Sequence, residues 1–484
     1  MRNDSFLISK RKGVFMNIEG KRIHFIGIGG TGMSGIASIL LDLGYKISGS
    51  DLQSTIITKR LTAKGAMIYK GHHGSHISGV NLVVISSAIN EENKEVIAAR
   101  KGKIEIIPRA EMLSRIMQQN YRIAVSGTHG KTTSTSMISL ILEKMNLDPT
   151  IAIGGEVNDI GGNAKLGKGD YVVVEADESD GSFLLLNPNV AVVTNIENDH
   201  LDYFTNLEKT VESFEKFIYK VPNDGCIIFG YDCPNARKVI NNQSSIKRVI
   251  SYGFHQDAQM KAVNPRFIKN SSISDIYFKN KKLGTLKLNI PGYHNISNAL
   301  AAISTAMELG IKFEDSKEIL FHFKGVKRRQ ELIANFHEML MIIDDYGHHP
   351  SEIKATLEAI RRGWPERRII TVFQPHRYSR TKLLLEQFGN AFQNSDIVII
   401  NDIYPANEKP IPGISAELVY QKVKKYKKDN VYYLPGKEKT ISFLIDSISN
   451  GDIVVTMGAG DVWKIGKELA KESKKFEAKV GIGS

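Results

Sequence analysis

A short glycine-rich run constrains the fold of this chain more than any other feature. It lies between an expected strand at 122–125 and an expected helix at 133–145, and it reads Gly127-Thr128-His129-Gly130-Lys131-Thr132-Thr133. A strand, a glycine turn and a helix in this order point backbone N–H groups and the positive helix end at one spot, where α/β proteins bind phosphate. The sequence therefore predicts an α/β fold with a phosphate loop at residues 127–133.

The residues after the second glycine supply what else a nucleoside triphosphate needs. Lys131 places an ammonium at the β- and γ-phosphates, and Thr132 places a hydroxyl on Mg²⁺. The loop reads G-x-x-G-K-T, two residues shorter than the common G-x-x-x-x-G-K-S/T form, and Val125 stands where that form has its first glycine. An ordinary strand-to-helix turn is the alternative interpretation. Gly127 and the flanking elements favour phosphate binding and the use of ATP or GTP.

Size and composition predict a cytoplasmic protein of several domains. The chain has 484 residues, 42% of them hydrophobic and 24% charged, which is too long for one core and ordinary for a globular protein. No apolar run reaches the ~20 residues of a membrane span, so membrane insertion is not expected. Residues 1–16 lack the apolar region of a secretory signal and are expected to be a loose extension. Cys226 and Cys233 lack metal-ligand spacing and predict free thiols in a reducing compartment.

The net charge of +12 bears on the choice of ligand. A strongly basic chain is typical of nucleic-acid binders, but here the lysines are scattered and no basic run is interleaved with aromatic residues. The same positive field attracts small anionic substrates. We therefore expect nucleotides and no nucleic acid, and the sequence makes no prediction of oligomeric state.

Strand, turn and helix patterns repeat in three units, which predicts parallel sheets with helices on both faces. The expected domains are 17–118 and 119–330, followed by 331–484. Residues 225–290 alternate like antiparallel strands, so the sheet of the central domain is expected to be mixed.

An earlier glycine turn, Gly27-Ile28-Gly29-Gly30-Thr31-Gly32, fits G-x-G-x-x-G, and Asp51 follows 19 residues later. This spacing is typical of dinucleotide binding, with Asp51 on a ribose hydroxyl, and makes an NAD-dependent oxidoreductase one hypothesis. A UDP-sugar satisfies the same requirements, because it also carries a diphosphate and a ribose. A simple packing turn is the third interpretation.

Two further strand ends carry candidate metal ligands. Glu175 ends an apolar strand and is followed by several acids, which otherwise serve to cap a loop. A carboxylate at the carboxyl end of a buried strand beside a phosphate loop is where a metal ligand belongs. His200 follows the strand at 190–194 and is expected at the same edge as Lys131, although a lone histidine is more often structural.

Other polar clusters precede a helix or a domain boundary. Asn295 and Asn298 either cap a helix or read an adenine edge. The run Lys327-Arg328-Arg329 is either a solvated charge cluster or a source of a cation for the transferred phosphate.

In the third unit, polar runs follow two expected strands: Asp344-Asp345-Tyr346-Gly347-His348-His349 and Gln374-Pro375-His376-Arg377-Tyr378-Ser379-Arg380. Loops at strand ends of open α/β sheets bind ligands. The histidine pair suggests zinc, but no third ligand accompanies it at a suitable spacing. Arg377 and Arg380 could instead hold a carboxylate.

Seven ordered motifs together resemble the Mur ligases of cell-wall synthesis. They are GIGGTGMSGIA, SGTHGKTTST, EADESDGSF, NIENDHLDYF, YHNISNALAA, DDYGHHPSE and QPHRYSRT, and the resemblance covers nearly all of residues 20–465. It is strongest to the branch that joins L-alanine to UDP-N-acetylmuramate. It implies a Rossmann-like UDP-binding domain, a central P-loop ATPase domain with a mixed sheet, and a Rossmann-like amino-acid-binding domain. It also implies an acyl-phosphate intermediate, made with ATP and Mg²⁺.

The resemblance further implies a role for each candidate residue. The loop residues Gly127, Thr128, His129, Gly130, Lys131, Thr132 and Thr133 would bind ATP, with Lys131, Glu175 and His200 as the catalytic residues. Thr132 and Glu175 would hold one Mg²⁺, and Glu175 with His200 a second. Asn295 and Asn298 would contact adenine, Asp345 and Tyr346 the ribose, and Arg329, in preference to Arg328, the nucleotide phosphates. The UDP part would meet Gly29, Gly30, Thr31, Gly32 and Asp51. The alanine carboxylate would meet His376, Arg377 and Arg380, and its amine would lie near His348.

Some branches of the family carry a carbamylated lysine as a metal bridge. Lys216 is the nearest candidate, but its neighbours do not fit that motif, so no carbamate is assigned. The alternatives are a sister ligase that attaches a recycled peptide to the same UDP-sugar, the oxidoreductase, and an inactive nucleotide sensor. The sensor is disfavoured because every expected phosphate- and metal-facing position is filled.

Overall fold

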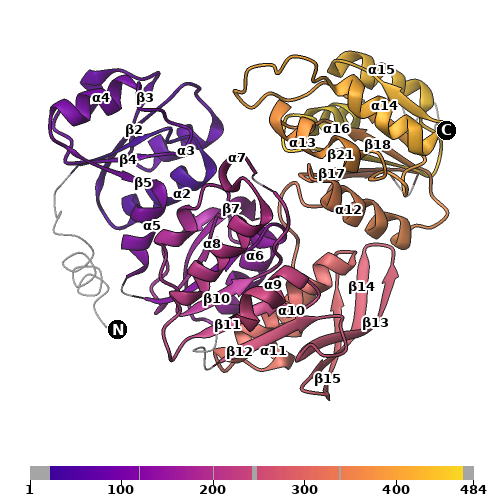
Figure 1. Ribbon diagram of the computed structural model, residues 1–484, viewed down its shortest axis with the longest axis horizontal. Helices are drawn as coiled ribbons and strands as arrows, with labels where there is room; N and C mark the ends of the chain where they lie inside the picture. The colour runs from indigo at the N-terminus through magenta and orange to yellow at the C-terminus, as the bar shows by residue number, and fades with distance from the viewer. Residues whose placement is uncertain are drawn as a thin grey trace. The chain divides into compact units, whose positions relative to one another are not determined.

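The computed structural model describes residues 22–118, 120–157, 159–199, 201–242, 248–336 and 339–472. Within these residues the strands form three sheets, of five, ten and six strands (Figure 1). The chain divides into two compact units. The first is Met1–Val263, Ile276–Gly284 and Ser297–Phe323, and the second is Asn264–Asp275, Thr285–Ile296 and Lys324–Ser484. The extension at 1–16 lies outside the described residues, and the three domain boundaries stay predictions.

The first sheet is parallel throughout. Its strands, in order across the sheet, are β3 (Met67–Lys70), β2 (Lys46–Asp51), β1 (Arg22–Ile26), β4 (Leu82–Ile85) and β5 (Glu105–Pro108). The segments between them form α2 (Thr31–Asp42), α3 (Ile56–Ala63), the 3₁₀ helix η1 (Gly74–Ile77) and α4 (Lys94–Lys101), and α5 (Arg109–Met117) follows β5. Parallel neighbours need such crossovers, and the expected Rossmann-like arrangement is confirmed.

The second sheet is mixed, as expected. Its order is β15 (Lys281–Leu288), β14 (Ser271–Phe278), β13 (Met260–Ile268), β12 (Val249–Gly253), β11 (Cys226–Gly230), β10 (Val190–Val193), β6 (Tyr121–Ser126), β9 (Tyr171–Glu175), β7 (Thr150–Val157) and β8 (Gly162–Lys165). β6 pairs in parallel with β10 and β9, whereas β7 and β8 are antiparallel. The register sets Ser126 beside Val193 and Val125 beside Glu175. The segment after β6 is therefore flanked by the ends of β10 and β9.

One expectation for this sheet is wrong in part. The antiparallel pattern was expected from residue 225 onward, but β10 to β13 pair in parallel. The reason is α9 (Pro234–Asn241), which gives β11 and β12 a helical crossover. The other helices of this region are α6 (Lys131–Lys144), η2 (Ser182–Leu185), α7 (Leu201–Phe204), α8 (Leu207–Tyr219), α10 (Tyr293–Glu308) and α11 (Phe313–Phe321).

The third sheet lies in the second compact unit. Its order is β16 (Glu331–Phe336), β17 (Leu340–Asp345), β21 (Asp452–Met457), β18 (Ile369–Phe373), β19 (Ile397–Ile400) and β20 (Val431–Tyr433). β16 is antiparallel to β17, and the other neighbours are parallel. Its helices are α12 (Pro350–Gly363), α13 (Tyr378–Phe388), α14 (Ala416–Lys427), α15 (Lys437–Ser447) and α16 (Trp463–Lys471).

This sheet has an apolar core on each face. Along β17, Leu340 and Ile342 belong to one buried cluster, whereas Met341 and Ile343 belong to another. Alternate residues of a strand point to opposite faces, so both faces must be covered. The helices between the strands provide that cover, and the strands read as continuous apolar runs for the same reason.

The helix after the phosphate loop begins two residues earlier than expected. α6 begins at Lys131 rather than at Thr133, because Gly130 takes a left-handed conformation and the helix starts directly after it. α13 covers Tyr378–Phe388, and residues 389–394 form turns after it. None of the helices in the described parts of the chain is both long and apolar enough to cross a membrane.

Candidate active site

Two glycines determine the shape of the phosphate loop. Gly127 has a φ of +133° and Gly130 a φ of +81°, which L side chains rarely adopt. A Cβ at Gly127 would lie 2.0 Å from Thr194 Oγ1, and one at Gly130 would lie 2.5 Å from Asn298 Oδ1. Gly130 also offers no side chain to cap α6, so the first N–H groups of that helix stay directed toward the loop. Glycine is required at both positions for conformation and for space.

The segment that follows β10 holds the loop in place. Asn195 accepts hydrogen bonds from the backbone of Thr128 at 3.0 Å and of His129 at 2.9 Å, and its amide donates to His129 O. Thr194 Oγ1 donates to the same carbonyl at 2.6 Å. Glu197 N donates to Thr128 Oγ1 at 2.8 Å. These contacts engage the N–H groups of Thr128 and His129 and the carbonyl group of His129, and so fix the loop against the segment that follows β10.

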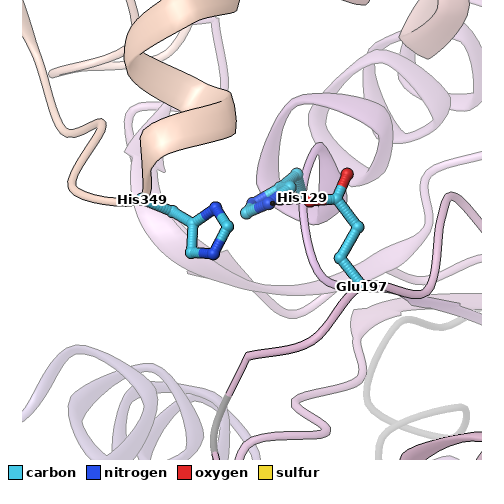
Figure 2. A group of neighbouring side chains, drawn as sticks. All are labelled: His129, Glu197 and His349. Carbon is cyan, nitrogen blue, oxygen red and sulfur yellow. Dashed lines mark ion pairs between the residues drawn. The ribbon is translucent and has the colours of Figure 1, made fainter. Parts of the chain in front are cut away.

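His129 forms an ion pair beside the loop. Its Nε2 lies 3.4 Å from Glu197 Oε2, and Figure 2 shows the two side chains. His349, also labelled there, belongs to the second compact unit, where its Nδ1 contacts Ser351 Oγ and its N–H donates to Glu352 at the start of α12. The pair in the first unit places a carboxylate and an imidazole next to Thr128.

Lys131 folds back over the loop. Its Nζ donates to Gly127 O at 2.6 Å and to Thr128 O at 3.2 Å, and it lies 2.8 Å from Glu178 Oε1. Burial disfavours the ammonium, but the nearby carboxylates, above all Glu178, raise the pKa of Lys131. Burial also raises the pKa of the Glu178 carboxyl to about 7. The lysine is thus a charged group held at the mouth of the loop.

Thr132 and Glu175 meet at the end of the sheet. Thr132 Oγ1 donates to Glu175 Oε1 at 3.1 Å, and Glu175 Oε2 accepts from Gly154 N at 2.8 Å. The two residues were expected to share a metal, and a hydroxyl beside a carboxylate is an oxygen donor set that suits Mg²⁺. Thr133 is buried behind them. The third expected ligand, His200, lies outside the described residues, so its place in this site is not described.

The first glycine turn closes on the end of β2. Gly27 N and Ile28 N donate to Ser50 O at 2.9 and 3.1 Å, and Gly29 N donates to Asp51 Oδ2 at 2.9 Å. Asp51 therefore lies against the turn, and its expected role at a ribose hydroxyl stays a prediction. Gly30 immediately precedes α2, and neither it nor an acid in the first turn caps that helix end.

The two asparagines take different positions on α10. Asn298 Oδ1 accepts from Ser134 Oγ at 3.2 Å and faces Gly130, so it lies against the phosphate loop. Asn295 is assigned to the second unit, where its amide donates to Pro291 O at 2.7 Å. Both side chains are buried.

In the second unit, the guanidinium of Arg328 is hydrogen-bonded within the third sheet and the loop that follows β21. Its Nε lies 2.9 Å from Asp344 Oδ2, and its other nitrogens donate to the carbonyl groups of Gly458 at 2.6 Å and Gly460 at 3.1 Å. Burial raises the pKa of Asp344, and Arg328 opposes that shift. Such a fully engaged guanidinium ties β17 to the loop after β21.

Arg329 contacts an aromatic ring and a carboxylate. Its guanidinium lies 5.0 Å from the centre of the Tyr346 ring and 3.4 Å from Glu352 Oε1. Asp345 directly precedes Tyr346 in the chain, and it accepts hydrogen bonds from the N–H groups of Gln330 at 2.9 Å and Gly347 at 2.7 Å. Burial raises the pKa of Asp345 to about 6, against the effect of Arg329. A cation, an aromatic ring and a buried acid thus converge at the end of β17.

The expected amino-acid-binding residues also lie together. The rings of His348 and His376 are 5.7 Å apart, and Arg380 Nη1 donates to His376 Nδ1 at 3.3 Å. His376 stacks on Tyr404 at 5.7 Å. Burial, with Arg380 and Arg377, lowers the pKa of His376 to about 4, so the ring is neutral at physiological pH. The positive charge here comes from the two arginines.

Comparison with known proteins decides the family. Three family profiles match in succession: "Mur ligase family, catalytic domain" at residues 22–121, "Mur ligase middle domain" at 125–306 and "Mur ligase, glutamate ligase domain" at 328–460. The UDP-N-acetylmuramate--L-alanine ligase of Geobacter sp. (strain M21) is 48% identical, over 94% of this chain and 99% of the relative. The chain belongs to the Mur ligase family.

Two more matches extend over nearly the whole chain. The UDP-N-acetylmuramate--L-alanine ligase of Dictyoglomus turgidum is 47% identical, over 95% of this chain and 98% of the relative. The crystal structure of a UDP-N-acetylmuramate-alanine ligase from Thermotoga maritima matches with a TM-score of 0.80 and 27% identity, over 94% of this chain and 99% of that one. The three-domain Mur ligase fold expected from the sequence is thereby confirmed.

Sequence reasoning missed two residues that organise the Mur ligase phosphate loop. Glu178 was counted among acids that cap a loop, but it is buried and pairs with Lys131. Asn195 was part of the run that includes His200, but it is the residue that holds Thr128 and His129. The signal for both was their place directly after buried strands, which did not show what each side chain would contact.

A buried carboxylate in the first domain was also missed. Glu95 is fully buried and accepts from Ser50 Oγ at 2.5 Å, and it contacts Nδ1 of His72 at 3.1 Å and of His76 at 2.6 Å. The carbonyl group of Ser50 accepts the two hydrogen bonds from the first glycine turn. Burial opposes the charge of Glu95, but hydrogen bonds from His24, Ser50 and His76 outweigh it and lower its pKa to about 2. Glu95 thus fixes the end of β2 through its hydrogen bond with Ser50.

We expect Glu95→Gln to lower the free energy of unfolding by roughly 2 kcal/mol, because it weakens several hydrogen bonds to a buried charge. The folded-state pKa lies below the value of 4.5 for a free glutamate, so the stabilisation is present above pH 4.5 and is lost as the pH falls toward 2. Thermal unfolding midpoints of the parent and the variant should therefore differ at pH 7 and converge below pH 4.5. Glu105→Gln, at an exposed glutamate of the same sheet, is the control. Equal midpoints at pH 7 would contradict the assigned role.

Proposed function

We propose that this chain is the ligase that joins L-alanine to the lactyl carboxylate of UDP-N-acetylmuramate at the expense of ATP. The curated relatives that match it over nearly their full length carry the name of that reaction. The activity is the first peptide-forming step in the synthesis of the peptidoglycan precursor. Free Cys226 and Cys233 support a place in the reducing cytoplasm.

One structural observation carries the proposal: Lys131, Thr132 and Glu175 converge at the end of β6 and β9. The ammonium of Lys131 lies over the loop and donates to two of its carbonyl groups, and the hydroxyl of Thr132 and the carboxylate of Glu175 lie 3.1 Å apart. These are the groups that hold and activate a nucleoside triphosphate. A dinucleotide-dependent oxidoreductase has no use for them.

The chemistry explains why a triphosphate is needed. A carboxylate is a poor electrophile, so its oxygen first attacks the γ-phosphorus of ATP, which releases ADP and forms an acyl phosphate. The amine of L-alanine then attacks the carbonyl carbon and loses a proton. The tetrahedral intermediate expels phosphate as the C–O bond breaks, and the new C–N bond remains. ATP, the lactyl carboxylate and the acyl phosphate are anionic, so catalysis consists mainly of positioning and of stabilising negative charge.

The residues of the loop fit ATP with Mg²⁺. Lys131 would neutralise the β- and γ-phosphates, and the loop N–H groups from residues 127–133 would surround them. Thr132 and Glu175 would hold Mg²⁺, whose chemical contribution is to withdraw negative charge from the phosphate oxygens. His200 is proposed as a ligand of a second Mg²⁺ on the sequence motif alone. Glu178 would keep Lys131 charged and close to the loop.

The remaining nucleotide contacts are proposed by position. Asn298, against Gly130, and Asn295, at the start of the same helix, would bind the adenine base. Asp345 and Tyr346 would hold the ribose. Arg329 would contact the nucleotide phosphates in preference to Arg328, whose guanidinium is occupied within the third sheet.

The two other substrates would bind at separate sheets. The diphosphate of UDP-N-acetylmuramate would lie at Gly29, Gly30, Thr31 and Gly32, where α2 begins uncapped, with Asp51 on the ribose. Arg377 and Arg380 would pair with the carboxylate of L-alanine. His376, neutral at physiological pH, would add a hydrogen bond, and His348 would lie near the amine.

A phosphate-release assay tests the function. The enzyme is given UDP-N-acetylmuramate and ATP. Separate reactions contain L-alanine, glycine, L-serine or a tripeptide that represents a recycled cell-wall peptide. We expect release with L-alanine and none when ATP or UDP-N-acetylmuramate is omitted. A preference for the tripeptide would assign the chain to the sister ligase instead.

Isotope transfer tests the intermediate. When the lactyl carboxylate carries oxygen-18, one labelled oxygen should appear in the inorganic phosphate, since the C–O bond of the acyl phosphate breaks. Mass spectrometry of the phosphate reports it. Unlabelled phosphate, with product formed, would exclude the acyl phosphate.

A further inference from the structure

A small pocket connects the first glycine turn with the phosphate-loop domain inside the first compact unit. Its lining includes Gly32, Arg109, Gly154, Glu175 and Asp177. Its volume of about 60 Å³ has room for roughly four water molecules, which is enough for a carboxylate and too little for a nucleotide. One end thus lies at the proposed diphosphate site and the other at the proposed Mg²⁺ ligand.

Arg109 provides the positive charge among the lining residues. It is the first residue of α5, and its Nη2 donates to Asp177 Oδ2 at 3.3 Å. A Cβ at Gly32 would lie only 2.1 Å from Arg109 Nη1, so the guanidinium occupies the space that a side chain would take at the start of α2. The side chain is about one quarter exposed and stands opposite Glu175 and Asp177.

The reaction requires a carboxylate in this place. UDP-N-acetylmuramate carries its diphosphate at one end and its lactyl carboxylate on the sugar beyond it, and that carboxylate must reach the phosphoryl group next to the metal ligands. Within this pocket it would approach Glu175 and Asp177, both negative. An anion enters such a site only with a cation to offset the repulsion.

We propose that Arg109 binds the lactyl carboxylate of UDP-N-acetylmuramate and presents it to the phosphoryl group. The proposal rests on the function proposed above and adds a substrate-binding residue to it. Arg109 holds the carboxylate of Asp177 before substrate arrives and exchanges it for that of the substrate. The exchange replaces one carboxylate by another, so little additional charge is desolvated.

The guanidinium suits the later steps as well. Its planar fork binds the two oxygens of a carboxylate at once, which fixes the direction from which the oxygen attacks. After phosphoryl transfer, the same N–H groups lie beside the acyl phosphate and offset its charge. A lysine in this place keeps the charge but loses the fork.

Direct binding measurements separate this role from others. UDP-N-acetylglucosamine has the same diphosphate and sugar but lacks the lactyl group. The dissociation constants of both UDP-sugars are measured by calorimetry without ATP. We expect Arg109→Ala to raise that of UDP-N-acetylmuramate at least ~10-fold and that of UDP-N-acetylglucosamine less than ~2-fold, because only the first ligand loses a charged hydrogen-bond pair. Arg109→Lys should retain part of the difference.

Arg60→Ala is the matched control. Arg60 also connects the two domains, through Glu156 Oε1 at 2.6 Å, but it does not line the pocket. It should leave both affinities unchanged, and thermal unfolding should show all variants folded. If Arg60→Ala weakens UDP-N-acetylmuramate binding as Arg109→Ala does, the loss of affinity reflects a broken contact between the two domains and not a lost contact with the substrate.

Each other outcome overturns the proposal in a recognisable way. Equal weakening of both ligands would assign Arg109 to the diphosphate, and no weakening of either would leave it a structural residue. If the parent protein binds neither UDP-sugar and releases no phosphate with L-alanine, the proposed function itself fails, and this inference fails with it.

Discussion

Replacing Lys131 by alanine should reduce kcat at least ~100-fold, a loss of about 2.7 kcal/mol of transition-state stabilisation. The ammonium lies within hydrogen-bond distance of two loop carbonyl groups and of Glu178, and its pKa is raised, so it is charged whenever nucleotide binds. During phosphoryl transfer, negative charge builds up on the oxygen that bridges the β- and γ-phosphates. Removing the cation therefore lowers kcat more than it weakens the binding of ATP.

The measurement is steady-state phosphate release with all three substrates at saturation. Lys144→Ala is the control, because Lys144 is exposed at the other end of the same helix and should change kcat less than twofold. A Lys131→Ala enzyme that turns over within threefold of the parent would remove this lysine from the mechanism.

Glu175→Gln should weaken the apparent affinity for Mg²⁺ by about 100-fold and lower kcat at physiological Mg²⁺ by a similar factor. Glutamine keeps the shape and can still accept the hydrogen bond from Gly154, so the fold of β9 is preserved. What it loses is the negative charge that a hard divalent cation requires. The loss of Mg²⁺ affinity arises at Glu175 Oε1, the oxygen that faces Thr132 Oγ1.

Titration of activity with MgCl₂ at fixed ATP provides the readout. Part of the lost rate should return at high Mg²⁺, which a general misfolding would not allow. Glu143→Gln is the matched variant: Glu143 lies on α6, pairs with Lys165, and should leave the Mg²⁺ requirement unchanged. If Glu175→Gln and the parent need the same Mg²⁺ concentration, Glu175 does not hold the metal.

Much of the fold follows from local patterns. The strands at Arg22–Ile26, Tyr171–Glu175 and Asp452–Met457 are short, mostly apolar runs, and such runs between turn residues are typical of buried parallel strands. The alternation at 225–290 was harder to interpret. Its first strands are parallel and the helix α9 separates them, and a short amphipathic helix of eight residues gives a weak periodic signal.

Part of the candidate site follows from the sequence in the same way. Thr132 and Glu175 were expected to meet because carboxyl ends of neighbouring parallel strands share an edge, and they do lie 3.1 Å apart. His348, His376 and Arg380 were expected together for the same reason, and they are adjacent. What each of these residues binds stays a prediction that the experiments above address.

The sequence by itself determined which local elements form and which of them carry phosphate-binding chemistry, since glycine placement, apolar periodicity and strand-end polarity act over a few residues. Only the tertiary structure decided the partners of charged groups that are distant in the chain. Glu178 with Lys131, Arg109 with Asp177, and Glu95 with His72 are separated by 47, 68 and 23 residues. Strand order and side-chain packing bring such groups together, and neither is encoded in any short stretch of sequence.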